Sequence, residues 1–286
     1  MNRLSQRLEP VDYLVIGHIA QDITPQGLRI GGTAAYSALT AKAFGLRVGV
    51  VTSCTSDLDL AALDGISISA VESDRNTTFE NIYTANGRIQ YLHHQAAPIN
   101  ITHVPETWRR TPIVHLGPIA QEIDPNLAKS FPDSLVGITP QGWLRSWDKS
   151  GRVRPSEWPE AAYVLEKSTA AVISIEDVQG NENRVDEMLA SVRILAVTEA
   201  ASGSRVYWNG DLRRFTAPSV TEVDATGSGD IYAAAFFYRL WNTRDPWEAG
   251  RFATNLASYS VTRLGLEGIP TYDEIQSCLV EVLPKY

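Results

Sequence analysis

The sequence predicts an α/β protein with a mostly parallel β-sheet covered by helices on both faces. Short apolar runs alternate with helix-like segments along most of the chain, which is the pattern of consecutive βαβ units. The 286 residues, 44% of them hydrophobic, suit one large α/β domain with a substantial core better than two independent domains.

The predicted strands are short and apolar, and helical patterns lie between them. The strands cover residues 11–17, 46–52, 112–117, 135–139, 170–175 and 194–198. Residues 33–45 predict a helix with Thr33 as N-cap and Gly45 just past its end. Helix-like segments near 121–131, 155–168 and 182–191 separate the later strands. A C-terminal helix begins after Asp245, with Pro246 at its first position and Glu248 completing a capping box.

Two hairpin signals differ from this alternation. Asn209-Gly210 joins two alternating strands within 204–215, and Asn86-Gly87 does the same within 77–94. The hairpin at 77–94 and the stretch 18–30 both interrupt the α/β pattern. We expect these two pieces to pair into a small sheet that projects from the main domain; the alternative is an extension of the main sheet.

Composition argues against several classes of protein. The net charge of −8 and the pI near 5.2 disfavour nucleic-acid binding, which needs a basic face. No apolar run has the length that crosses a bilayer, and the first ten residues lack the apolar stretch of a signal peptide. A cytoplasmic protein without a membrane partner is therefore predicted. Cys54 and Cys278 belong to no metal-binding spacing and are interpreted as reduced thiols.

The stretch DATGSGD, residues 224–230, precedes an apolar segment that predicts a buried helix. A buried helix N-terminus leaves N–H groups that need an acceptor, and small residues let an anion approach them closely. Asp230 lies in the first turn, where it is placed to accept a proton from a hydroxyl that attacks phosphorus. The alternative is that Asp224 or Thr226 caps the helix and the glycines only allow a turn.

Two motifs together resemble one known family. DATGSGD follows a late signature of the form D-T-x-G-[AS]-G-D, and GGTAAYSALTAKAFG at 31–45 resembles an early Gly-Gly followed by a helix that ends in Leu-Gly. Their order and separation, and the hairpin between them, are similar to those of the ribokinase-like (PfkB) carbohydrate kinases. The resemblance implies a doubly wound α/β fold over residues 1–286, with a β-sheet lid formed by inserted segments at about 18–30 and 66–98. Residues 77–92 and the later API also resemble the branch that includes inositol kinase-like proteins, which places Arg88 and Gln90 toward the substrate.

The resemblance implies an ATP-dependent kinase that transfers the γ-phosphate to a hydroxyl of a small sugar, an inositol-like polyol or a nucleoside. Asp230 then matches the catalytic base, and the N–H groups of Gly227, Ser228 and Gly229 match the anion hole. The remaining carried-over residues fall into two groups. Asp22, Gly31, Gly32 and Tyr36 match substrate-binding positions, and Thr198, Gly203, Thr226 and Asn255 match nucleotide-binding positions.

Some positions depart from the family pattern. In SIED, residues 174–177, Ser174 and Asp177 replace the asparagine and glutamate that organise Mg²⁺, while Glu176 and Asp177 still supply hard oxygen ligands. Ala200 replaces the first glycine of the nucleotide segment. Tyr36 stands where ribokinases have an asparagine, which argues against ribose and for a bulkier or more apolar contact. Many relatives also use a monovalent cation such as K⁺, for which Asp224 is the candidate ligand.

Further expectations concern the substrate, the partners and the activity itself. Gln141 and Arg145 follow a strand, at the sheet edge where open α/β folds bind ligands, and are expected to meet a substrate hydroxyl or an ATP phosphate. Edge strands of the lid attract partners, so a homodimer through the lid is predicted. The hairpin residues that favour it are Phe79, Ile82, Tyr83 and Tyr91.

The alternative function is a ligand-binding or regulatory protein with weak or no turnover. A dehydrogenase is disfavoured because GHIAQD is not a G-x-G-x-x-G loop.

Overall fold

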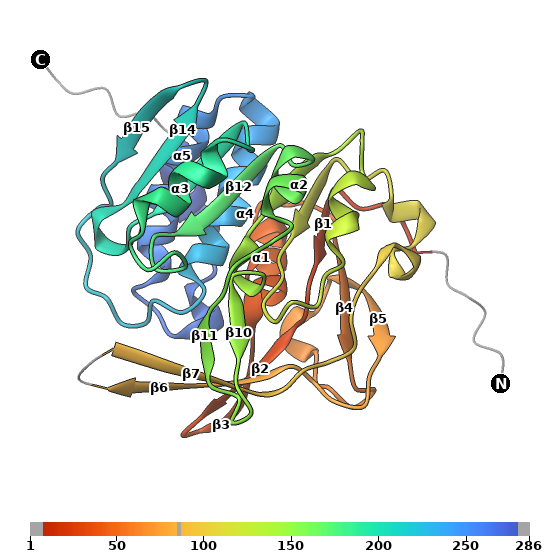
Figure 1. Cartoon of the computed structure of the whole chain (residues 1–286). Helices are drawn as coiled ribbons and strands as arrows, with labels where there is room; N and C mark the ends of the chain where they lie inside the picture. The colour runs from red at the N-terminus through yellow and green to blue at the C-terminus, as the bar shows by residue number, and fades with distance from the viewer. Residues whose placement is uncertain (1–7, 85–86, 280–286) are drawn as a thin grey trace, which may run out of the picture.

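A nine-stranded sheet lies at the centre of the computed structural model, which describes residues 8–84 and 87–279 (Figure 1). Seven neighbouring strands are parallel, and two at one edge are antiparallel. From edge to edge the order is β15 (Asp211–Phe215), β14 (Ser204–Trp208), β13 (Ile194–Thr198), β12 (Ala170–Ser174), β9 (Leu135–Ile138), β8 (Ile113–Leu116), β1 (Tyr13–Ile16), β4 (Val48–Cys54) and β5 (Ser67–Glu72). The predicted fold class is confirmed.

Helices cover both faces of this sheet. One face carries α1 (Gly32–Ala43), α4 (Ser228–Thr243), α5 (Pro246–Ser260) and α6 (Tyr272–Leu279). The other carries α2 (Ala161–Glu166) and α3 (Glu182–Leu189). Successive residues of β1 alternate between the two cores, because Tyr13 and Val15 join the first and Leu14 and Ile16 the second. This double burial explains why the strands are apolar throughout.

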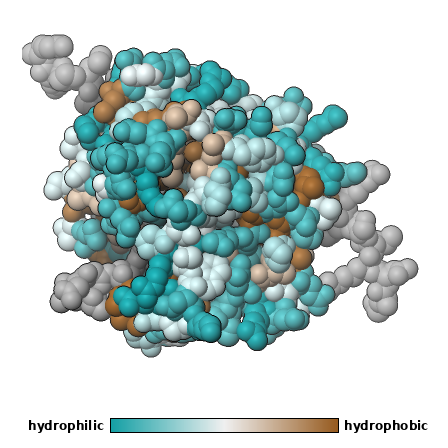
Figure 2. Space-filling view, viewed as in Figure 1, coloured by the Kyte–Doolittle hydropathy of each residue, from teal (hydrophilic) through white to brown (hydrophobic). Residues whose placement is uncertain are grey.

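The outer surface has a different character from these cores. Figure 2 shows a face that is hydrophilic over most of its area, with scattered apolar residues. Among the helices of the described ranges, none is both long and apolar enough to cross a bilayer.

Two local expectations are wrong. The segment near 121–131 forms a 3-10 helix over Pro125–Lys129 only, with the Asp124 side chain accepting from the Asn126 N–H at 2.9 Å. Thr33 does not cap α1, because Gly31 is the N-cap and makes no side-chain cap bond. Thr33 lies in the first turn instead, and its hydroxyl points toward α4.

The small sheet forms from the two expected pieces, in the order β3 (Gly27–Gly31), β2 (Ala20–Thr24), β6 (Thr78–Thr84) and β7 (Gly87–His94). We call this four-stranded sheet the lid. The predicted turn residue Asn86 lies outside the described residues. The expected inserted segment 66–98 begins too early, because residues 67–72 are β5 and pair with β4 in the main sheet. Sequence reasoning also missed a short hairpin next to the lid, β10 (Arg145–Trp147) with β11 (Val153–Pro155).

His18 lies where the chain passes between the main sheet and the lid. The buried ring bonds two other passing segments, with Nε2 2.9 Å from the Ala97 carbonyl oxygen and Nδ1 2.6 Å from the Thr77 hydroxyl. The His18 N–H donates to the buried Glu122 carboxylate, which also accepts from the N–H groups of Ile119 and Ala120. These bonds fix the base of the lid on the main domain.

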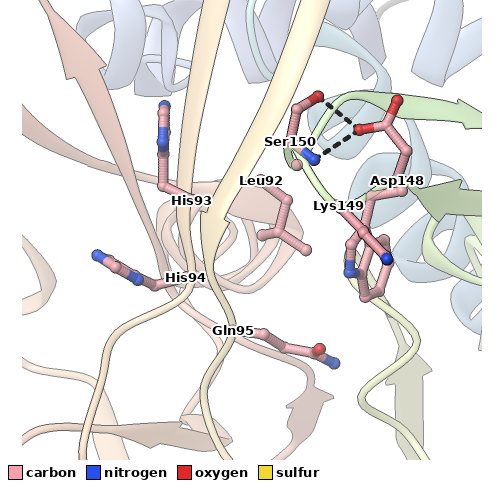
Figure 3. Close-up of a pocket in the computed structure, with 9 residues that line it drawn as sticks. Leu92, His93, His94, Gln95, Asp148, Lys149 and Ser150 are labelled. Carbon is pink, nitrogen blue, oxygen red and sulfur yellow. Dashed lines mark hydrogen bonds between the residues drawn. The ribbon is translucent and has the colours of Figure 1, made fainter.

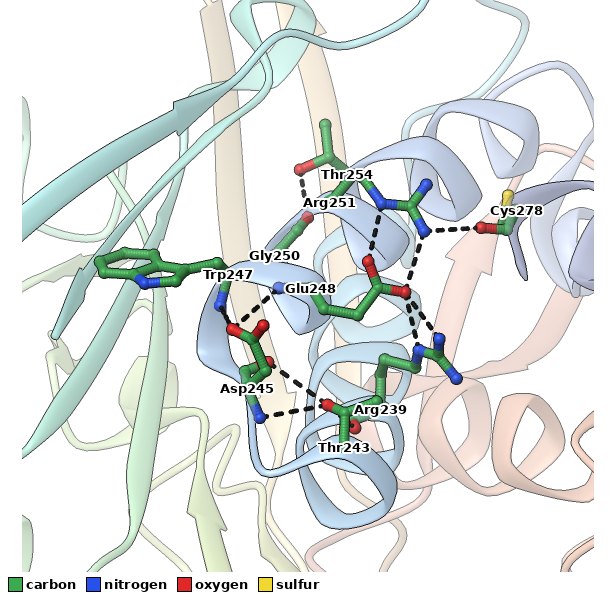
Figure 4. Close-up of polar contacts among 9 residues, drawn as sticks. All are labelled: Arg239, Thr243, Asp245, Trp247, Glu248, Gly250, Arg251, Thr254 and Cys278. Atoms are coloured by element: carbon green, nitrogen blue, oxygen red, sulfur yellow. Dashed lines mark hydrogen bonds and ion pairs between the residues drawn. The ribbon is translucent and has the colours of Figure 1, made fainter. Parts of the chain in front are cut away.

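The corner between α4 and α5 combines a cap with a charge network (Figure 4). Asp245 caps α5 as expected, accepting from the N–H groups of Trp247 and Glu248 at 2.8 and 3.3 Å. The expected capping box does not form, because the Glu248 carboxylate binds Arg239 and Arg251 instead. This network holds α5 against α4, whose first turn carries the site described next.

Candidate active site

A cavity of about 710 Å³ lies between the lid and the carboxyl ends of the parallel strands. Thr139, Ser174 and Thr198, at or just after the ends of β9, β12 and β13, line its floor, and residues of β2, β6 and β7 line the side formed by the lid. The cavity brings together fourteen predicted site residues. They are Asp22, Gly32, Tyr36, Gln141, Arg145, Glu176, Asp177, Thr198, Gly203, Thr226, Gly227, Ser228, Gly229 and Asp230.

Gly31 and Asn255 do not line this cavity. A Cβ at Gly31 would collide with Oδ2 of Asp22, so this glycine makes room for the Asp22 carboxylate. Asn255 faces away because the cavity side of α5 is formed by Thr254 and Ser258, one turn apart. The predicted nucleotide contact by Asn255 thus has no support from the lining of this cavity.

Gly227 is the N-cap of α4 and has a positive φ of 79°. A Cβ there would collide with the Tyr36 ring, so both the backbone and the space require glycine. The Gly227 carbonyl accepts the first helical bond from the Ile231 N–H, and the Ser228 N–H donates to the Ala225 carbonyl at 3.2 Å. Within the described residues, the N–H groups of Gly227 and Gly229 have no protein acceptor. These two donors lie at the positive end of α4, where backbone N–H groups commonly bind anions, whereas the Ser228 N–H is already paired with Ala225.

Asp224 shapes the loop rather than lining the cavity. Its Oδ1 accepts from the Thr226 N–H and its Oδ2 from the Gly265 N–H, both at 2.9 Å. Burial alone would raise the pKa of Asp224, but these hydrogen bonds outweigh it and hold the pKa below its ordinary value. The carboxylate thus ties the loop to the segment that follows α5.

Asp230 lies at the junction of the loop, the lid and the main sheet. Burial raises the pKa of Asp230 to about 6, and the carboxylates of Asp177 and Asp22 add to the rise. The Thr33 hydroxyl, which donates to Oδ1 at 2.6 Å, and the charge of Arg145 oppose it. The carboxylate is therefore mostly ionised at neutral pH, yet basic enough to accept a proton from an alcohol in a transition state.

The SIED turn presents two carboxylates in different ways. Asp177 is fixed, with Oδ2 accepting from the Ser174 N–H at 2.9 Å and Oδ1 from the Gln141 side chain at 3.1 Å. Glu176 is exposed and faces the cavity. The described residues contain no cluster of three or more protein ligands for a metal. Mg²⁺ commonly binds through one or two carboxylates, water and substrate phosphates, and this pair fits that mode.

Charge distinguishes the cavity from an ordinary phosphate site. Among the described residues that line it, the cationic side chain is Arg145, whereas five are carboxylates. These are Asp22, Glu176, Asp177, Glu222 and Asp230. A polyanionic ligand therefore needs backbone N–H groups and an accompanying cation to enter this cavity.

Several lining residues were missed from the sequence. Thr33, interpreted as a cap, instead holds the Asp230 carboxylate; its position directly after the glycine pair was the available signal. On the lid, Asn81 was missed; it faces the cavity beside Gln90, which was expected there, and accepts from the Gln90 amide at 3.0 Å. Small and mostly apolar residues of 217–220 and of α5 also line the cavity, and only the fold brings these segments together.

Comparison with known proteins agrees with this geometry. Residues 160–271 match the model of the pfkB family carbohydrate kinases. The cytidine kinase of Thermococcus kodakarensis is 25% identical over 253 residues, covering 79% of this chain and 87% of that protein. A pyrophosphate-dependent kinase of the ribokinase family superposes with a TM-score of 0.79 at 20% identity, covering 93% of this chain and 99% of the other. Ribokinase of Arabidopsis thaliana, solved with ribose and ATP, gives a TM-score of 0.72 at 15% identity, covering 96% and 100%.

The fold and the site thus define a class of protein, the small-molecule kinases with a ribokinase fold. Within that class, residues 160–271 are similar to the pfkB family carbohydrate kinases, and the cytidine kinase similarity extends over most of the chain.

Proposed function

We propose that this protein transfers the γ-phosphoryl group of ATP to a hydroxyl of a small, neutral polyol. The observation that carries the proposal is the position of Asp230, a carboxylate with a raised pKa in the first turn of α4, beside the N–H groups of Gly227 and Gly229. A base and an anion hole at one point are what phosphoryl transfer to an alcohol requires.

In this proposal Asp230 accepts the proton as the acceptor oxygen forms its bond to the γ-phosphorus, while the bond from that phosphorus to the bridging oxygen breaks and ADP leaves. The N–H groups of Gly227 and Gly229 stabilise the charge on the transferring group, and Arg145 adds positive charge from the lid side. Bound Mg²⁺ would neutralise charge on the donor phosphates, with Glu176 and Asp177 holding it through water. Thr33 keeps the Asp230 carboxylate in one orientation through its 2.6 Å bond.

ATP is favoured over pyrophosphate as donor by the shape and charge of the cavity. Small and apolar residues such as Ala217, Pro218, Val220 and Ala257 line part of the cavity, and they suit a purine ring. A pyrophosphate donor would depend on cationic side chains, and Arg145 alone supplies a positive charge among the described lining residues. Apolar contact with a base therefore provides binding free energy that the phosphates do not obtain here.

The acceptor side favours a neutral polyhydroxylated molecule. Carboxylate and amide groups of Asp22, Asn81, Gln90 and Gln141 face it, and these groups suit hydroxyls. An anionic acceptor would have to compete with the transferring phosphoryl group for Arg145. The Tyr36 ring lines the cavity and lies directly against Gly227, so it limits the space on the acceptor side.

A donor and acceptor panel tests the proposal. Purified protein is incubated with Mg·ATP or Mg·pyrophosphate and with myo-inositol, ribose, fructose or cytidine, and release of ADP or phosphate is measured. We expect acceptor-dependent ADP release with a polyol and little turnover with pyrophosphate. Turnover with pyrophosphate alone would contradict the choice of donor. Nucleotide binding by thermal shift without turnover across the panel would favour a ligand-binding protein instead.

Two further features extend the proposal. Asp224 and the carbonyls of its loop are the candidate site for K⁺. If K⁺ binds there, ADP release should be faster in KCl than in LiCl.

Exposed Ile23, Leu28 and Ile82 on the lid support a homodimer through that sheet, whereas Phe79 is buried and faces the cavity. The side chain of Tyr83 lies outside the described residues. A monomeric mass by light scattering would contradict the dimer.

A further inference from the structure

The β10–β11 hairpin connects the lid to Arg145. Arg145 is the first residue of β10 and lines the cavity, while the tip of the hairpin contacts β7 (Figure 1). The Leu92 N–H donates to the Gly151 carbonyl at 2.8 Å, and Tyr91 forms an antiparallel bridge with Arg152. The hairpin is thus bonded to a lid strand at one end and reaches the active site at the other.

Apolar packing strengthens this connection. Trp147 and Val153, one on each strand of the hairpin, pack against a small core that contains Phe79 and Leu92 of the lid. Arg145 and Trp147 are two residues apart on one strand, so their side chains share a face of the hairpin. A displacement of Trp147 with the lid would therefore displace Arg145 as well.

Asp148, Lys149 and Ser150 in the turn of the hairpin lie beside Leu92 of the lid (Figure 3). Asp148 Oδ1 accepts from the hydroxyl and the N–H of Ser150 and from the Arg152 N–H. The hydrogen bond from the Ser150 hydroxyl is the main reason that the pKa of Asp148 falls to about 2. Gly151 has a φ of 82°, and a Cβ there would collide with the Leu92 carbonyl oxygen. Both the conformation and the close approach require glycine.

We propose that the contact of Gly151 with Leu92 positions Arg145 for phosphoryl transfer, so that the lid and the catalytic arginine move as one unit. Acceptor binding under the lid would then also place the positive charge beside Asp230. This inference rests on the proposed kinase function, and it assigns to Gly151, which does not line the cavity, a role exerted through Arg145.

A double-mutant cycle tests the inference. Gly151→Ala should lower kcat/KM with Mg·ATP and the fastest acceptor of the panel by on the order of 10- to 100-fold, as expected for a misplaced catalytic group. The same substitution in an Arg145→Ala background should have little further effect, because the group that it misplaces is already absent. Gly180→Ala is the matched control, since Gly180 also has a positive φ of 71° but open space around its Cβ position.

Several outcomes would overturn the inference. Unchanged turnover of Gly151→Ala would do so, and so would an equal loss in the Arg145→Ala background. If Gly151→Ala does not fold, Val153→Ala, which weakens the packing of the hairpin on the lid, replaces it in the same cycle. Absence of turnover in the unmodified protein refutes the proposed function rather than the coupling. The coupling is then tested by hydrogen exchange at 145–147, which should rise in Gly151→Ala and whose constancy would refute it.

Discussion

The floor of the active site and the lid are built in opposite ways. The floor consists of parallel strand ends and the first turn of α4, so residues 227–230 place the anion hole and the base within one short segment. The lid side collects one or two residues each from β2, β6, β7 and the β10–β11 hairpin. The difference suggests that chemistry is set by a local motif, whereas acceptor choice depends on pairings between distant segments.

Among substitutions in the floor of the active site, removal of the base should lower the catalytic rate most. Asp230→Asn keeps the shape of the side chain but cannot accept a proton, so kcat should fall on the order of 10³-fold. Binding of Mg·ATP, followed by thermal shift, should be retained. A fall of less than tenfold in kcat would show that another group takes the proton.

Gly227→Ala should destabilise the loop at the start of α4, because alanine does not suit the backbone conformation at that position. The left-handed conformation and the collision with Tyr36 together should destabilise the protein by about 2–4 kcal/mol in urea unfolding. Gly229→Ala is the control, because open space surrounds its Cβ position. Equal stability of the two variants would argue against the role of Tyr36 beneath the loop.

On the lid, Gln90→Leu should change acceptor binding and little else. Loss of its bond to Asn81 and of its contact with a hydroxyl should raise the acceptor KM about tenfold, with the KM for ATP unchanged. Asn255→Leu, an amide replaced outside the cavity, should leave both constants as they are. A rise in the KM for ATP in Gln90→Leu would show that this lid residue also affects donor binding, which would contradict the separation of floor and lid.

The pH dependence should report Asp230. With its pKa near 6, kcat/KM should be level above pH 7 and about tenfold lower at pH 5, since only the ionised carboxylate accepts the proton. Thr33→Val removes the hydrogen bond that lowers this pKa, so the acidic limb should move to higher pH. A limb that stays in place in Thr33→Val would instead reflect ionisation of the donor phosphates.

The smallest expected effect is that of Asp230 ionisation on the stability of the folded protein. The pKa of Asp230 is raised in the folded protein from an ordinary value of 3.8, so its protonated form is favoured by folding. That contribution is present below about pH 4 and is lost as pH rises through 6. Asp230→Asn should therefore raise the melting temperature by a few degrees at pH 8, on the order of 1 kcal/mol, and by less at pH 4. The reverse pattern would contradict the pKa shift.

Prediction from sequence succeeded where the signal was local. The main strands, the cap at Asp245 and the DATGSGD loop each depend on a few neighbouring residues. The inserted segment was predicted to start at 66 because β5 differs little in pattern from a lid strand, and its partner β4 is known only from the fold. The β10–β11 hairpin was missed because its strands of three residues are too short for a periodic signal.

In the site, too, prediction from sequence depended on whether the signal was local. Asp230 and its glycines were predicted from one motif, whereas Asn255 was placed in the cavity although the neighbouring Thr254 and Ser258 face it. A rotation of about 100° per residue decides which side chain of a helix reaches a ligand, and this angle cannot be read without the packing of α5.

The bonds of His18 also bear on the order of folding. Residues 18, 77 and 97 must meet before the base of the lid exists, and β2 pairs with β6 only after the chain has passed through α1, β4 and β5. Closing so long a loop is unfavourable until the main sheet has formed. During refolding, we expect nucleotide binding to recover first and selection of the alcohol last.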